Sequence, residues 1–266
     1  MFIYLNNFTG NLLKHLLYSV KIKEQIPNVI TLLNLLAGCI AIVFGFEDQL
    51  VAASCLIGLA AVFDFFDGFA ARLLKISSPI GKELDSLADV VSFGVVPGVI
   101  LYRLLSGNID CPVINIAGKN IVPFIAFLIP LFSAIRLAKF NTDERQTDSF
   151  IGLPTPANAI LIASFPLIIK QKSTLTGINI NLFSELTGNP YFIIILTIVL
   201  SYLLIAELPL MSLKFKTFNW KKNRIRYIFL SISMLLIILL FYTAIPLIIL
   251  LYIILSLSSK NHKSKI

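Results

Sequence analysis

Long apolar runs recur along the whole chain, and they constrain its fold more than any other feature. Crossing a bilayer takes about 20 apolar residues per helix, and runs of that order repeat too often for a soluble core. We expect eight helical spans, at residues 28–46, 50–71, 84–104, 121–138, 153–169, 191–211, 227–242 and 244–258. The last two are short and adjacent, so we expect a tight hairpin near Pro246, one over-long helix being the alternative. The sequence therefore predicts an all-α integral membrane protein with about eight transmembrane helices.

The basic residues agree with this count. With the N-terminus inside, 18 of the 22 lysines and arginines fall on the cytoplasmic side, as the positive-inside bias requires. The net charge of +8 then mostly reflects the membrane topology, and it also gives some attraction to membrane lipids. No basic segment interleaved with aromatic residues indicates nucleic-acid binding. We expect a bacterial cytoplasmic membrane protein with both termini on the cytoplasmic side.

The chain is predicted to form one membrane-embedded unit with short flanking pieces. Residues 1–26 have an apolar side and a basic side, which is typical of an amphipathic helix lying along the cytoplasmic membrane surface. Residues 27–211 form a core of six spans, and residues 212–226 form a basic cytoplasmic loop. Residues 227–266 form a C-terminal helical hairpin with a basic tail.

Four aspartates interrupt the apolar pattern where the second span ends and the third begins. Asp64 and Asp67 are one turn apart, and so are Asp85 and Asp89. Side chains at this spacing share a helix face, and the short connection makes the two helices neighbours, so four carboxylates converge. Clustered carboxylates repel one another, and the nearby bases are too few to neutralise them. Carboxylate oxygens suit Mg²⁺ or Mn²⁺, so the pattern predicts a site for two such ions.

The acidic cluster is also compatible with two roles that need no enzyme. The aspartates can be helix caps or ion-pair partners at the membrane interface. Intramembrane acids also mark ion paths, so a divalent-cation transporter is an alternative of another class. Transport sites tend to lie near the bilayer midplane at broken helices, whereas these acids lie at one edge and open toward the cytosol.

Small residues and one arginine accompany the acids. Gly68, Ala71 and Gly81 remove side-chain bulk where something must approach the helices closely, and Arg72 adds a positive charge. A narrow cleft of this kind suits a pyrophosphate and a flat ring. Helix–helix packing would also account for the glycines.

The complete pattern reads Asp64-x2-Asp67-Gly68-x2-Ala71-Arg72-x8-Gly81-x3-Asp85-x3-Asp89. It resembles the full signature of the CDP-alcohol phosphotransferase family. The resemblance implies a membrane enzyme with a six-helix catalytic core, here residues 27–211, usually in a homodimer. It also implies a reaction in which a hydroxyl attacks a CDP-linked lipid or alcohol and CMP is released.

Carried over to this chain, the resemblance makes Asp64, Asp67 and Asp85 metal ligands. Asp89 becomes the base for the attacking hydroxyl and touches metal as well. The resemblance places the cytidine and pyrophosphate against Gly68, Ala71, Arg72 and Gly81. Asn28, Thr31 and Asn34 form a polar stripe on the first span that resembles the family's nucleotide-side helix. Hydrogen bonding between helices would also account for that stripe.

The acceptor alcohol is harder to predict. The segments SAIRLAKFN (133–141) and GLPTPANA (152–159) are similar to those of integral-membrane phosphatidylserine synthases, which implies CDP-diacylglycerol and L-serine as substrates. Arg136 and Lys139 are candidates for the serine carboxylate, with Asn141, Thr155 and Asn158 as weaker candidates. Both basic residues suit a lipid phosphate or the positive-inside bias equally well. Glycerol 3-phosphate or an inositol phosphate is the alternative acceptor, and Glu207 is an acid in the sixth span without an evident role.

Overall fold

The structure is a computed structural model, and it describes residues 25–76, 78–142, 150–171, 181–211 and 220–263. These residues are almost wholly helical, which confirms the all-α prediction. Their only strands are two antiparallel pairs of two residues each. The predicted surface helix and much of the basic loop, residues 1–24 and 212–219, lie outside the described residues.

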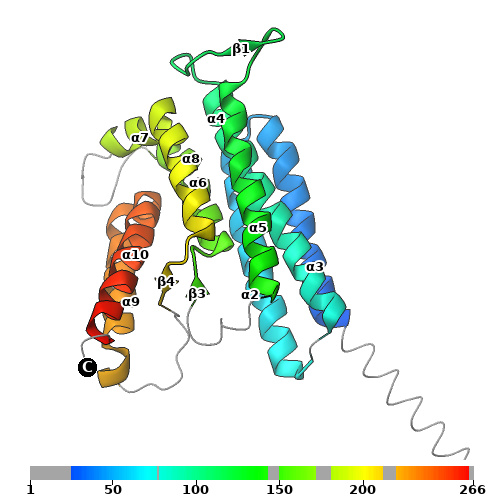
Figure 1. Cartoon of the computed structure of the whole chain (residues 1–266), viewed down its shortest axis with the longest axis vertical. Coiled ribbons are helices and arrows are strands. Elements are labelled where there is room, and N and C mark those ends of the chain that lie inside the picture. Colours follow the sequence, from blue (N-terminus) through cyan, green and yellow to red (C-terminus); the bar gives the residue numbers. More distant parts are fainter. Residues whose placement is uncertain (1–24, 77, 143–149, 172–180, 212–219, 264–266) are drawn as a thin grey trace, which may run out of the picture.

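Three long antiparallel helices form one side of the molecule (Figure 1). They are the helix Gln25–Phe46, α2 (Leu50–Leu74) and a 28-residue helix from Pro79 to Ser106. The third consists of α3 (Pro79–Asp89), a π-helical turn η1 (Val90–Val95) and α4 (Val96–Ser106). The apolar faces that point away from the protein core suit lipid: Val29, Leu36 and Val43 repeat every seven residues and are each about half exposed.

A fourth helix packs on this group at its π-helical turn. After the hairpin β1 (Asn115–Ile116) and β2 (Lys119–Asn120), a 3-10 turn η2 (Val122–Phe127) leads into α5 (Leu128–Thr142). Gly94 allows a close approach, because a Cβ there would lie 3.2 Å from the Ser133 Cβ and 3.3 Å from the Pro130 Cα. The absence of a side chain at Gly94 lets α5 pack against η1, the turn that directly follows the acidic residues of α3.

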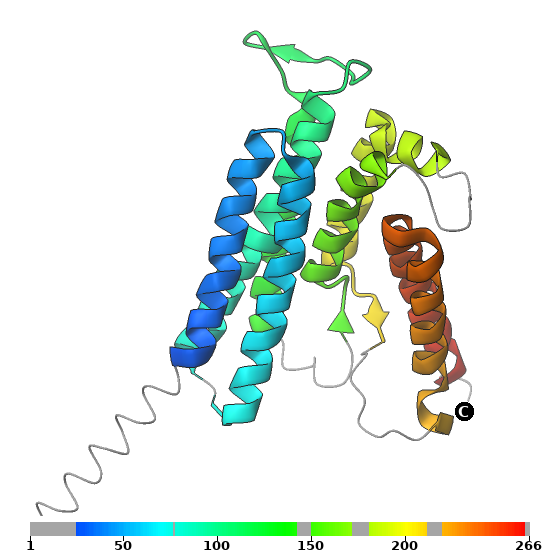
Figure 2. The ribbon, with the colours of Figure 1, turned by 180° about the vertical axis from the view of Figure 1, so that it is seen from behind.

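The second half begins with the other strand pair. β3 (Phe150–Ile151) pairs with β4 (Pro209–Leu210), and the helices α6 (Thr155–Lys170), α7 (Asn181–Gly188) and α8 (Pro190–Ile205) lie between them in sequence. Gly152 has φ +78°, and a Cβ there would lie 2.6 Å from the Leu204 carbonyl oxygen, so glycine is required. The pair holds the start of α6 beside the end of α8, and α6 packs along α2 (Figure 2).

The C-terminal region is a hairpin of two helices, α9 (Trp220–Leu240) and α10 (Ala244–Lys263). The Phe229 and Tyr252 rings lie 5.8 Å apart, whereas a straight helix would separate them by about 35 Å. The predicted reversal is thus present, but it occurs at η3 (Phe241–Thr243), where Phe241 has φ +52°. Pro246 lies in the first turn of α10, which tolerates a proline without breaking the helix.

Five stretches are long and apolar enough to cross a membrane, namely Gln25–Phe46, Leu50–Leu74, Pro79–Ser106, Val122–Thr142 and Asn223–Leu257. A sixth arises if α7 and α8, bent by 73°, count as one span. α6 has 16 residues and is shorter than these. Length and composition therefore support five to six spans, fewer than the eight predicted, because α6 is short and the hairpin counts as one run.

Glu207 corrects one sequence-based expectation. α8 ends at Ile205, and the chain continues in an extended conformation toward β4. Glu207 is exposed and lies two residues beyond the end of α8, so it does not belong to the helical part of the predicted sixth span. An exposed carboxylate at a helix end needs no buried partner.

Candidate functional site

The four aspartates come from two helices that meet through a short connection. α2 ends at Leu74, and the next residue, Lys75, adopts the left-handed conformation with φ +54°. α3 begins after Ser78, whose Oγ accepts a hydrogen bond from the Gly81 backbone N–H at 3.0 Å, with Pro79 in the first turn. These local signals stop one helix and start the next. They bring the last turns of α2 beside the first turns of α3.

Three of the aspartates form a compact group. Asp64, Asp67 and Asp85 each place one carboxylate oxygen within 4.8 Å of the other two. Oxygens that bind one Mg²⁺ at about 2.1 Å lie up to about 4.2 Å apart, so small side-chain rotations bring all three to a single ion. The group therefore fits a hard divalent cation, as the sequence predicts.

The charge of this group is not neutralised by protein. Within the described residues, none of the aspartates forms an ion pair with Arg72, Lys82 or Arg136. One buried carboxylate oxygen of Asp85 has no hydrogen-bond partner. An unpaired carboxylate removed from water is costly, and a cation is the ligand that would offset this cost.

Asp89 lies next to the group but outside it. Its side chain is 7% exposed, and it accepts a hydrogen bond from the Asn34 Nδ2 at 3.2 Å. It is near enough to Asp64 and Asp85 for their charges to interact. The π-helical turn begins at the next residue, a distortion that is frequent at functional sites. The structure thus brings all four acids together, three of them close enough to share one cation and Asp89 beside them.

The polar stripe of the first helix faces these acids. The Thr31 Oγ1 lies 2.7 Å from the Asp67 Oδ2 and 3.1 Å from the Pro27 carbonyl oxygen, so its single proton is shared between them. The Asn34 carbonyl oxygen accepts a hydrogen bond from the Ser92 Oγ at 3.0 Å, which ties the helix to η1. The stripe therefore orients two carboxylates, Asp67 through Thr31 and Asp89 through Asn34.

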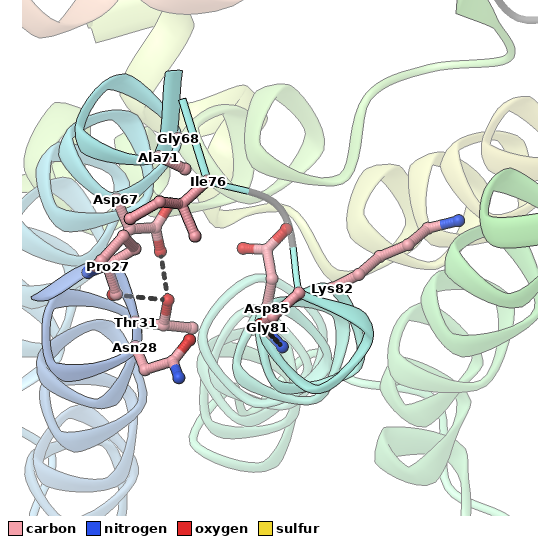
Figure 3. A pocket seen from close by; sticks show the side chains of 11 residues that line it. Pro27, Asn28, Thr31, Asp67, Gly68, Ala71, Ile76, Gly81, Lys82 and Asp85 are labelled. Carbon is pink, nitrogen blue, oxygen red and sulfur yellow. Dashed lines mark hydrogen bonds between the residues drawn. The ribbon is translucent and has the colours of Figure 1, made fainter. Parts of the chain in front are cut away.

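A pocket of about 180 Å³ opens beside Asp67 and Asp85 (Figure 3). It lies between the first helix, the end of α2 and the start of α3. Its lining residues are Pro27, Asn28, Thr31, Asp67, Gly68, Ala71, Ile76, Ser78, Gly81, Lys82 and Asp85. Five of the six residues predicted to bind the nucleotide are in this lining. The sixth, Arg72, is exposed.

The two glycines of the pocket have different roles. A Cβ at Gly81 would lie 2.9 Å from the Ser78 Oγ and 3.1 Å from the Asn28 Oδ1, so packing within the protein excludes a side chain there. A Cβ at Gly68 would meet only the Arg72 guanidinium, at 3.7 Å. Protein packing therefore does not require glycine at position 68, and the open space there leaves room for a ligand to approach α2 closely. The same distance places the Arg72 guanidinium beside the pocket.

The three predicted acceptor residues are not equivalent in the structure. Arg136 is buried on α5, 7% exposed, and its charge interacts with that of Asp89. Lys139 is exposed. The Asn141 Nδ2 donates to the Ser86 Oγ at 2.8 Å, and the Asn141 carbonyl oxygen accepts from the Lys82 Nζ at 2.8 Å. Asn141 thus clamps α5 to α3, and the structure gives it a positioning contact.

The sequence pattern did not predict this clamp or one further feature. Lys82 and Ser86 are four residues apart and face α5, a spacing that could have suggested a shared contact. The buried hydroxyl of Ser133, on the face of α5 that carries Arg136, was also missed. A serine in an apolar helix carries no signal that identifies its neighbour, so only the packing of α5 on η1 reveals it.

A family model described as CDP-alcohol phosphatidyltransferase matches residues 24–258. The chain is 32% identical over 208 residues to a CDP-diacylglycerol–serine O-phosphatidyltransferase from Helicobacter pylori (strain ATCC 700392 / 26695), covering 77% of this chain and 80% of the relative. It is 37% identical over 147 residues to a protein of the same name from Mycobacterium leprae (strain TN), covering 52% and 45%. It is 37% identical over 145 residues to an archaetidylserine synthase from Methanothermobacter thermautotrophicus (strain Delta H), covering 53% and 58%.

Proposed function

The chain belongs to the CDP-alcohol phosphatidyltransferase family, and on this premise we propose that it transfers the phosphatidyl group of CDP-diacylglycerol to the hydroxyl of L-serine. The products are phosphatidylserine and CMP. Family membership makes the chain a multi-pass membrane enzyme, and it replaces the alternative of a divalent-cation transporter. The names of the relatives favour serine over glycerol 3-phosphate or an inositol phosphate.

One observation supports the proposal most strongly. Three carboxylates from two helices converge within 4.8 Å at the edge of a pocket that is lined by small residues and by the polar face of the first helix. A pyrophosphate needs cations beside it and a backbone that allows close approach. The pocket offers both, because the acids gather cations and Gly68 leaves room.

The cofactor that suits this site is Mg²⁺ or Mn²⁺, in two copies. Asp64, Asp67 and Asp85 would hold the ions, with Asp89 as a further ligand. Their oxygen-only donor set suits hard cations, and no histidine or cysteine joins the group that the described residues form. When bound, such ions polarise the phosphates and offset the negative charge that develops on CMP.

The chemical step requires a base for the acceptor hydroxyl. We assign this role to Asp89, which receives the serine proton as the serine oxygen bonds to the phosphorus of the phosphatidyl phosphate. The bond between that phosphorus and the bridging pyrophosphate oxygen breaks, and CMP leaves with the electron pair. Asn34 holds the Asp89 carboxylate in place through its hydrogen bond, which supports a fixed direction for proton transfer.

The two substrates approach Asp89 from different sides. The cytidine and pyrophosphate lie in the pocket against Asn28, Thr31, Gly68, Ala71 and Gly81, with Arg72 at a phosphate. The serine lies on the side of α5, where Arg136 is a buried cation for its carboxylate. Lys139 is exposed and reaches either the serine or the lipid phosphate.

The orientation in the membrane follows from the charges. The helix ends that carry the aspartates also carry most of the basic residues, so we propose that the site faces the cytosol with both termini. The chain reverses at η3 between α9 and α10, which supports two crossings there, and we keep eight crossings in total as part of the proposal. The homodimer that the resemblance implies is part of the same proposal.

A transfer assay tests the function directly. Purified full-length protein in lipid nanodiscs is given CDP-diacylglycerol, Mg²⁺ and one labelled alcohol at a time: L-serine, glycerol 3-phosphate or inositol 1-phosphate. We expect labelled lipid and stoichiometric CMP with serine alone, and neither in the presence of EDTA. Labelled lipid from another alcohol and not from serine would reassign the acceptor while keeping the family chemistry.

A further inference from the structure

Four buried polar side chains on α5 and α6 have atoms that no protein group satisfies. They are Ser133 and Arg136 on α5, and Thr155 and Asn158 on α6, with exposed fractions of 0%, 7%, 1% and 0%. The unpartnered atoms are the two hydroxyl oxygens, the Arg136 Nε, and both the Oδ1 and the Nδ2 of Asn158. A buried polar atom without a partner costs free energy, so a set of them on two neighbouring helices indicates a ligand or ordered water.

This set lies beside the proposed base. Ser133 packs against Gly94 of η1, and α5 runs antiparallel to the helix that contains η1. One turn along α5 from Ser133, Arg136 therefore lies opposite the start of η1, next to Asp89, and their charges interact. α6 contacts both α5 and η1, and Thr155 and Asn158 lie in its first turn. The four residues thus lie on the two helices that pack against η1, the turn that begins one residue after Asp89.

Some other buried hydroxyls are satisfied by their own helix, although those of Ser201 on α8 and Ser233 on α9 have no partner either. Ser164, on the same helix as Asn158, donates its hydroxyl proton to the Leu161 carbonyl oxygen at 2.6 Å. Thr197 on α8 bonds in the same way to the Ile193 carbonyl oxygen at 2.7 Å. A hydroxyl in a helix finds its own backbone easily, whereas the terminal amide of a buried asparagine needs a partner from elsewhere.

The chemistry of the set fits a small zwitterion. Arg136 supplies a cation for a carboxylate, and a planar guanidinium holds it by paired hydrogen bonds. The Asn158 amide oxygen and the hydroxyls of Ser133 and Thr155 are neutral acceptors, which suit an ammonium group. An acceptor that carries a phosphate and no ammonium leaves the Asn158 oxygen unsatisfied.

We propose that Asn158 is a specificity-determining residue of the acceptor site, where its amide oxygen accepts a hydrogen bond from the ammonium group of an amino-acid acceptor whose carboxylate is bound by Arg136. The proposal rests on the proposed function, because it takes serine as the acceptor. It adds the group that distinguishes serine from alcohols without an amine. A site built to hydrogen-bond a substrate group rejects the analogue that lacks it, since its buried polar atoms are then unpaired.

Two acceptors and two variants test this assignment. The acceptors are L-serine and 3-hydroxypropanoate, which has the hydroxyl and the carboxylate but no ammonium. The variants are Asn158→Leu, which removes both amide atoms at similar size, and Asn158→Asp, which keeps an acceptor oxygen. Ser164→Ala on the same helix is the matched control for loss of a buried polar group. All are measured as full-length protein in nanodiscs, with thermal unfolding as a check of folding.

We expect Asn158→Leu to raise the serine concentration at half-saturation by about 10- to 100-fold, with the CDP-diacylglycerol requirement unchanged. Its preference for serine over 3-hydroxypropanoate falls by the same factor, and Asn158→Asp retains most of the preference. Ser164→Ala keeps the wild-type preference.

Several results overturn the assignment. An unchanged preference in both variants, or equal losses with the two acceptors, makes Asn158 structural. If Asn158→Leu does not fold, the folded Asn158→Asp variant decides instead. Because that variant keeps an acceptor oxygen, a loss of its preference for serine over 3-hydroxypropanoate contradicts the proposed role. Wild-type protein that transfers to neither acceptor but to a phosphorylated alcohol overturns the proposed function itself, which is a separate outcome.

Discussion

The two sides of Asp89 differ in the charge of the polar groups that they carry. On the α2 side, three carboxylates lie together, and the first helix donates hydrogen bonds to Asp67 and Asp89. On the α5 and α6 side, a buried arginine, a buried asparagine and two hydroxyls carry atoms without partners. One side is acidic and suits cations with a pyrophosphate; the other is cationic or neutral and suits a small polar acceptor. A transferase needs both environments, because its two substrates differ in charge and must meet at one base.

The largest effect is expected on the acidic side. Asp64→Asn, Asp67→Asn and Asp85→Asn each remove a metal ligand, and we expect CMP release to fall about 100- to 1,000-fold or more. CMP release by purified variants, titrated with Mg²⁺ and Mn²⁺, is the measurement. Glu83→Gln is the matched control, because Glu83 is an exposed acid on the same α3 helix. Near-normal activity in any two of the three variants would refute a metal site made by these residues.

Asp89 joins the two sides, so its loss should affect turnover more than binding. We expect Asp89→Asn to lower the turnover number about 100- to 10,000-fold, as loss of a general base does, while CDP-diacylglycerol affinity changes little. Single-turnover kinetics with a separate CDP-diacylglycerol binding isotherm measures the two quantities. A drop in affinity equal to the drop in rate would show that Asp89 is mainly a metal or substrate ligand, which would move it to the acidic side.

A smaller effect is expected on the acceptor side. Arg136→Ala removes a charge-assisted hydrogen bond, which costs about 1.5–3 kcal/mol, or roughly ten- to hundredfold in kcat/KM for serine. Lys139→Ala has a weaker effect, because Lys139 is exposed and an ammonium lacks the paired geometry. Steady-state kinetics with each substrate varied in turn checks this. If both variants weaken CDP-diacylglycerol use instead, these residues bind the lipid phosphate.

The smallest effect is expected at the opposite end of the helices. Arg103 donates hydrogen bonds to Asp48, including Nε to Oδ1 at 2.8 Å, and this bond holds the pKa of Asp48 below its usual value. Because the pKa of Asp48 is lower in the folded protein, the pair stabilises the folded state at pH values above the unfolded pKa of about 3.9. This stabilisation is lost as the pH falls through the lower pKa of the folded state. Because the pair is exposed, it contributes little to the stability of the folded state.

We therefore expect Asp48→Asn to leave CMP release unchanged and to lower the thermal midpoint slightly at pH 7. The difference from wild type should shrink toward zero when unfolding is followed at pH values below about 4. Calorimetry of both proteins across this range is the measurement. A clear loss of activity would mean that this end of α2 and α4 is coupled to the site.

Much of the acidic side could be predicted from the sequence, because its residues are close in the chain. Asp64 and Asp67 share a helix face, as do Asp85 and Asp89, and a short connection leaves the two helices few ways to pack. The spans that carry them were likewise placed to within a few residues, for example 50–71 against Leu50–Leu74. Helical periodicity and apolar length are local properties, so the sequence alone determined them.

Only the tertiary structure decided which distant side chains meet. Thr31 faces Asp67, Asn34 faces Asp89, and Asn141 is occupied by Ser86 and Lys82, although the sequence predicts Asn141 as a ligand residue. The buried environment of Arg136 depends on how closely Gly94 lets α5 approach η1. The place of the C-terminal reversal, at Phe241 and not at Pro246, also follows from packing of the two arms. These features depend on contacts between segments more than 30 residues apart or on small differences in backbone energy, neither of which is written in a local pattern.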